Sequence, residues 1–152
     1  MTATPPLEPQ LKAPSKEESA AASPAVRSAA RWFWWIAGLS LVNIFMSQSE
    51  NGANFVAGLG LTSIVDAMFA TNPSTGYAID AAILGFFVVV GLQGLKGKLW
   101  AFYAGVAVYI LDALIFLLAQ EWIPVAFHGL VIYFIVRGAL ELQNALKASD
   151  NN

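Results

Sequence analysis

The chain of 152 residues contains no cysteine and a single histidine, and only 12 % of its residues are charged. The absence of cysteine excludes disulfides, thiolate catalysis and cysteine-ligated metal sites. One histidine excludes a histidine-rich metal site. An average soluble domain carries about 25 % charged residues, so a water-soluble fold of this length would lack the polar surface to cover its core. The formal net charge of −2 provides no basic field for nucleic acid.

Apolar residues are abundant, at 57 % of the chain, and they occur in long runs. A helix that crosses a hydrocarbon core of about 30 Å needs about 20 mostly apolar residues. Three runs meet this length, at residues 77–95, 99–119 and 122–142. The links between them are only two or three residues long, so we expect the three helices to be antiparallel neighbours. A shorter run at 32–48 is a fourth candidate, which a tryptophan-rich start extends into the membrane interface.

The segment 55–70 is ambiguous. Its sixteen residues would reach about 24 Å as a helix, less than the thickness of the hydrocarbon core. It contains two glycines, a threonine, a serine and Asp66. It therefore either spans the membrane as a fifth helix, enters and leaves on one side, or lies in the interface.

The placement of basic residues distinguishes these possibilities, because lysine and arginine near helix ends favour the cytoplasmic side. If 55–70 does not span, all eight fall on one side: Lys12, Lys16, Arg27, Arg31, Lys96, Lys98, Arg137 and Lys147. If it spans, the eight divide four against four. The sequence thus predicts an all-α membrane protein, an antiparallel bundle of four transmembrane helices plus a short re-entrant or interfacial helix at 55–70, with five transmembrane helices as the alternative. Both termini are expected in the cytoplasm, in a plasma membrane or a bacterial inner membrane.

The two ends of the chain are more polar than its middle. Residues 1–30 are rich in proline, alanine and serine and contain no apolar run, so they do not form a cleavable signal peptide. They are predicted to be a disordered cytoplasmic tail, because they cannot bury enough apolar surface to offset the entropy of ordering. The helical transmembrane domain is expected at 31–146, followed by a short tail at 147–152.

Small residues indicate which helix faces approach each other, because burying leucine against leucine gives little association within lipid. A stripe of this kind in the run 99–119 consists of Ala101, Gly105, Val108 and Asp112. A second small patch in the preceding run consists of Ala78, Ala81, Ala82 and Gly85. We expect both to face the interior of the bundle.

Polar residues gather in the half of the bundle opposite the basic residues. Asp112 and His128 each lie about eight residues from the turn near Gln120, on successive antiparallel helices, so we expect them at the same depth. The other members of this candidate cluster are Asp80, Asp66, Asn43 and Tyr109. An ionisable side chain at the centre of a bilayer costs roughly 3 kcal/mol on insertion scales, so each one requires a functional or structural reason.

Two interpretations of the cluster follow from its chemistry. An aspartate–histidine pair can relay protons, and a group of carboxylates can hold a cation. Alternatively Asp112 is a structural link between helices, hydrogen-bonded to His128 or Tyr109, and this is the preferred interpretation. On that basis Asp112→Asn is expected to change stability little and Asp112→Leu more. No catalytic residue, metal site or cofactor is predicted.

Size, short loops and the lack of a domain outside the membrane favour a non-enzymatic accessory or assembly subunit. Its expected partners are the lipid bilayer and either further copies of the chain or a larger membrane complex. The alternative is a subunit of a transporter or channel for a proton, cation or small solute, which would use Asp112 and His128. A membrane-embedded enzyme is a weaker third hypothesis. A water-filled cavity that reaches Asp112 would favour the second or third, and a dry, fully paired cluster would favour the first.

Overall fold

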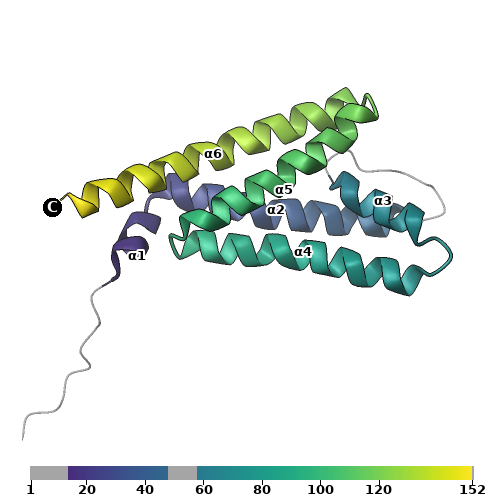
Figure 1. Ribbon diagram of the computed structural model, residues 1–152, viewed down its shortest axis with the longest axis horizontal. Coiled ribbons are helices and arrows are strands. Elements are labelled where there is room, and N and C mark those ends of the chain that lie inside the picture. Colours follow the sequence, from purple (N-terminus) through teal and green to yellow (C-terminus); the bar gives the residue numbers. More distant parts are fainter. Residues whose placement is uncertain (1–13, 48–57, 152) are drawn as a thin grey trace, which may run out of the picture.

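The computed structural model describes residues 14–47 and 58–151, which form six α-helices and no strand (Figure 1). The helices are α1 (Lys16–Ala21), α2 (Pro24–Ser47), α3 (Gly60–Met68), α4 (Pro73–Leu95), α5 (Leu99–Leu118) and α6 (Trp122–Asp150). Four of them, α2, α4, α5 and α6, are long and apolar enough to cross a membrane. The nine residues of α3 rise only about 14 Å, too little to span. These findings confirm a bundle of four long helices with one short helix between the first and second.

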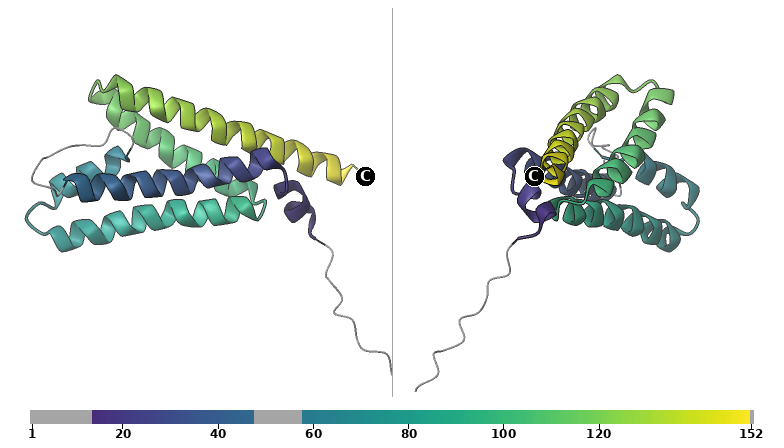
Figure 2. Two further views of the ribbon diagram at one scale, coloured as in Figure 1. Left: turned by 180° about the vertical axis from the view of Figure 1, so that it is seen from behind. Right: turned by 60° about the vertical axis from the view of Figure 1, so that its left-hand side comes forward.

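The four long helices run lengthwise, and α3 packs against α2, α4 and α5 near one end of the bundle (Figure 1). That end, here called the α3 end, also holds the α5–α6 turn. The opposite end, here called the terminal end, holds α1, the last residues of α6 and the α4–α5 turn. Figure 2 shows the C-terminus close to α1 from two further directions. Both termini of the described chain therefore lie at the same end of the bundle.

Two of the turns contain a left-handed backbone. In the α4–α5 turn Gly97 has a φ of 76°, and a Cβ atom there would lie 2.3 Å from the carbonyl oxygen of Glu17. Glycine is therefore required both for the conformation and for the approach of α1. In the α5–α6 turn Gln120 has a φ of 59°, and the N–H of Glu121 donates to the carbonyl oxygen of Phe116 at 2.9 Å.

Aromatic rings fill the centre of the bundle. The ring of Phe33 lies 6.4 Å from that of Phe87 and 6.0 Å from that of Phe102, measured between centroids, and all three side chains are buried. The ring of Phe33 also occupies the space beside Gly105, where a Cβ atom would lie 2.3 Å from it. The stripe on α5 thus faces the interior as expected, with Ala101, Gly105 and Asp112 buried.

The small patch on α4 does not face the interior. Ala78, Ala81, Ala82 and Gly85 are all exposed, and α4 instead buries Gly76, Asp80, Phe87, Val90, Gly91 and Gly94. The expectation was wrong because α4 carries small residues on more than one face. The face that holds Gly91 and Gly94 meets α2, where Ala30 and Trp34 fill the space beside these two glycines.

The ends of the chain are more ordered than their composition suggested. α1 begins with a capping box in which Ser15 and Glu18 satisfy each other's backbone N–H groups. Lys16 Nζ lies 3.2 Å from Asp150 Oδ1, and Lys98 forms an ion pair with Glu17. The tail boundaries expected at residues 30 and 147 therefore differ from those of the structure, since α2 begins at Pro24 and α6 continues to Asp150. Residues 1–13 of the expected tail lie outside the described residues.

Candidate functional site

The first turn of α3 begins inside the bundle, without a cap from its own sequence. The residue before it, Leu59, has an apolar side chain that makes no capping hydrogen bond. Leu59 and Thr62 are each only 1 % exposed. The first N–H groups of a helix have no partner within that helix, and an unsatisfied N–H within the membrane costs several kcal/mol. Partners for these groups must therefore come from other helices.

Asp112 of α5 and Ser40 of α2 supply those partners. The N–H of Gly60 donates to Asp112 Oδ2 at 3.1 Å, and the N–H of Leu61 donates to Asp112 Oδ1 at 2.8 Å. The N–H of Leu59 donates to Ser40 Oγ at 3.0 Å, and the Ser40 hydroxyl donates in turn to the carbonyl oxygen of Ile36 at 2.8 Å. Asp112 therefore does for α3 what an N-cap aspartate normally does from within the same helix.

His128 of α6 completes the hydrogen bonding of Asp112. Its Nε2 lies 2.9 Å from Asp112 Oδ2, and its Nδ1 lies 2.8 Å from the carbonyl oxygen of Pro124. A carbonyl oxygen only accepts, so Nδ1 of His128 is the donor in its contact with Pro124, and the Nε2–Oδ2 contact is a hydrogen bond that requires one further proton between the two side chains. Asp112 therefore has three hydrogen-bond partners, and both ring nitrogens of His128 are satisfied.

Aromatic rings enclose this pair on the side of His128. The ring of Tyr109 stacks on the imidazole with 4.3 Å between centroids and 22° between planes, and Phe116 lies at 5.2 Å. The Tyr109 hydroxyl is buried and has no hydrogen-bond partner among the described residues, so Tyr109 contributes its ring and not the hydrogen bond to Asp112 that was considered. The side chains of His128 and Asp112 are 0 % and 1 % exposed.

Asp80 and Asp66 form a separate pair of acidic residues. Asp80 of α4 is 2 % exposed, and neither carboxylate oxygen has a hydrogen-bond donor among the described residues. The carboxyl group of Asp66 of α3 is its acidic neighbour and lies within hydrogen-bonding reach of it. Asp80 lines a groove of about 270 Å³ between α2 and α4, together with Leu41, Ile44, Phe45, Tyr77, Ala81 and Leu84.

Asn43, the remaining candidate, is a residue of α2 that lies beside Gly58, in the segment that leads into α3. It is buried, and a Cβ atom added to Gly58 would lie 2.7 Å from its own Cβ. The six candidates are thus not one cluster. Asp112, His128 and Tyr109 come together, Asp66 and Asp80 lie as a second pair, and Asn43 contacts the segment that leads into α3. The backbone amides of Gly60 and Leu61 were missed as the partners of Asp112, and that of Leu59 as the partner of Ser40. The sequence feature that could have indicated them is Leu59, an apolar residue at the start of the short helix that cannot cap its first N–H groups.

Comparisons of the chain with protein-family models, with curated proteins and with solved structures gave no match. Within residues 14–47 and 58–151 no three histidine, aspartate or glutamate side chains lie close enough together to hold a metal ion. The function must therefore be inferred from the two acidic sites and the surfaces around them.

The geometry changes the expected effect of Asp112→Asn. An asparagine has one acceptor oxygen, and its NH₂ group would face an amide or the imidazole. At least one buried donor would lose its acceptor, so we expect a loss of about 1–3 kcal/mol in unfolding free energy. Asp112→Leu removes every acceptor and leaves the two amides and the imidazole without a partner, so a larger loss than in Asp112→Asn is expected. Thermal unfolding in detergent should rank the melting temperatures as wild type, then Asn, then Leu.

Two further measurements make this test specific. Because the chain has no cysteine, a single Val65→Cys on the buried face of α3 reports the docking of α3 through its alkylation rate, which should rise in both Asp112 variants. Asp150→Asn is the control, since its partner Lys16 is exposed and such a pair contributes less than about 1 kcal/mol. An Asp112→Asn variant as stable as the Asp150→Asn control would contradict the capping role.

Proposed function

We propose that the protein is a non-enzymatic subunit of a larger membrane assembly. The observation that supports this most directly is the saturation of Asp112 and His128 by hydrogen bonds within the chain. A group that relays protons or binds a cation must be reached by water or by the ion and must be able to exchange partners. Both side chains are sealed from solvent, and neither lines the groove that contains Asp80. The pair is suited to holding helices together.

The surface between α2 and α4 provides a place for a partner. The exposed small patch on α4 (Ala78, Ala81, Ala82 and Gly85) allows the backbone of another transmembrane helix to come close. Ala81 also lines the groove that contains Asp80. A buried carboxylate without a donor is unfavourable in lipid, and a donor from outside the chain would correct this. The small patch, which permits close packing, therefore adjoins the groove in which the Asp80 carboxylate lacks a donor.

The chemistry of the groove indicates what the partner helix carries. Two copies of this chain related by a two-fold axis would place one Asp80 carboxylate opposite the other, and Asp66 adds a further acidic group nearby. Like charges in a low dielectric repel strongly. A different chain with a lysine or arginine at this depth would instead form an ion pair with Asp80. We therefore infer a heteromeric assembly through α4.

Ala81→Leu tests this assembly without disturbing the fold, because Ala81 is exposed. After gentle extraction from its own membrane, the wild type should migrate well above the 16.3 kDa of a single chain. Ala81→Leu and Asp80→Leu should shift it toward the monomer, the first by blocking close approach and the second by removing the charge. Ala107→Leu, at an exposed alanine of α5, is the matched control and should leave the assembly intact.

The partner chain found with the wild type should contain a basic residue in a transmembrane helix, and replacing that residue by methionine should have the same effect as Asp80→Leu. A wild-type protein that is monomeric under these conditions would refute the proposal. So would a proton or cation flux in liposomes that depends on Asp112, because that result would assign transport to the sealed pair.

We also propose that the terminal end faces the cytoplasm of a plasma membrane or a bacterial inner membrane. Seven of the eight lysines and arginines lie in the half of the described bundle that holds this end, and the eighth, Lys12, lies outside the described residues. Basic residues are retained on the cytoplasmic side during insertion. A side-specific reporter fused after Asn152 should report the cytoplasm. A signal from the opposite side would overturn the orientation and leave the fold unaffected.

A further inference from the structure

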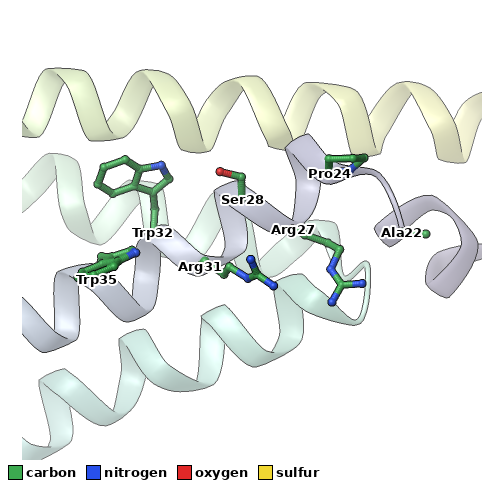
Figure 3. Close-up of a pocket in the computed structure, with 7 residues that line it drawn as sticks. All are labelled: Ala22, Pro24, Arg27, Ser28, Arg31, Trp32 and Trp35. Carbon is green, nitrogen blue, oxygen red and sulfur yellow. The ribbon is translucent and has the colours of Figure 1, made fainter.

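The terminal end of α2 carries a groove of about 560 Å³ that the proposed assembly does not use. It is lined by Ala22, Pro24, Arg27, Ser28, Arg31, Trp32 and Trp35 (Figure 3). Arg27 and Arg31 are one helical turn apart, and Figure 3 shows their side chains extending to the same side of α2. Two guanidinium groups therefore border one groove at the start of a membrane-spanning helix.

These two arginines have no acidic partner in the described part of the chain. The acidic side chains near this end are already engaged, Glu17 with Lys98, Asp150 with Lys16 and Glu141 with the hydroxyl of Ser23. A guanidinium group matches the geometry of phosphate oxygens and binds them through two parallel hydrogen bonds. The groove therefore offers two unneutralised positive charges to an anion.

Along this face of α2 the residues change from charged to aromatic to apolar, which is the order of the layers in a lipid leaflet. Arg27, Arg31 and Trp35 are four residues apart and descend about 12 Å along one face of α2. Tryptophan is favoured at the level where headgroups meet acyl chains, and Trp35 is 63 % exposed. The same face continues with Gly38 and Val42, which are exposed, and no atom lies within 4 Å of a Cβ built at Gly38. Charge, aromatic ring and open apolar surface thus follow one another in the order phosphate, glycerol and acyl chain.

We propose that this groove binds an anionic phospholipid of the leaflet next to the terminal end. Arg27 and Arg31 contact the phosphate oxygens. Trp35 borders the glycerol region, and one acyl chain follows α2 past Gly38 and Val42. Anionic lipids are preferred over zwitterionic ones because the latter carry an ammonium group that the two arginines repel.

Binding is measured on the full chain in detergent, from the shift in melting temperature and from lipid-bound masses, during titration with phosphatidylglycerol or phosphatidylcholine. Phosphatidylglycerol should bind more tightly, and Arg27→Gln with Arg31→Gln should weaken it about thirtyfold, given the attraction typical of two basic side chains near an anionic surface. The double Arg→Lys variant should recover only part of this loss, because lysine lacks the planar fork.

The control removes the same charge elsewhere at this end, with Lys96→Gln and Lys147→Gln, whose side chains are exposed. It should weaken phosphatidylglycerol binding by less than twofold. Equal weakening in both double variants, or equal binding of the two lipids, would overturn the site and leave only general surface attraction. Inorganic phosphate distinguishes the source of the anion. If phosphate alone stabilises the protein as strongly as the lipid does, and through the same arginines, the lipid assignment is wrong.

Discussion

The position of α3 depends on one requirement, which is that the free amides at the start of a helix need acceptors where there is no water. Three consecutive N–H groups, at residues 59–61, meet this requirement through Asp112 of α5 and Ser40 of α2. Nε2 of His128 of α6 is the third hydrogen-bond partner of Asp112. A single carboxylate thereby links α3, α5 and α6, and Ser40 extends the link to α2.

The bundle contains two buried aspartates, Asp112 and Asp80, that differ in their hydrogen bonding. Asp112 has three hydrogen-bond partners, two backbone N–H groups and the imidazole of His128. Asp80 is equally buried, yet it has no donor in the described part of the chain. The two residues therefore differ in the number of their donors and not in their burial. This difference underlies the proposal that the groove beside α4 binds a partner.

Much of this fold could be predicted from the sequence because the membrane imposes simple rules. Apolar run lengths gave the four long helices, and the equal distances of Asp112 and His128 from Gln120 placed both at one depth. The packing face of α4 could not be predicted, because small residues occur on more than one side of it. Nor could the amides of α3 be recognised as partners, since every residue has a backbone N–H and only the position of the helix start makes three of them significant. The docking of α1 depends on Asp150 and Lys98, which are distant in sequence.

The most direct test of this account is the hydrogen bond between His128 and Asp112. The chain contains one histidine, so ¹⁵N labelling of histidine gives the two ring signals of His128 alone, without assignment. In detergent or lipid we expect the Nε2 signal to change in Asp112→Asn and to stay as in the wild type in the Asp150→Asn control. An Nε2 signal that is the same in the wild type and in Asp112→Asn would contradict the hydrogen bond between the two side chains, and with it the explanation of how α3 is held inside the bundle.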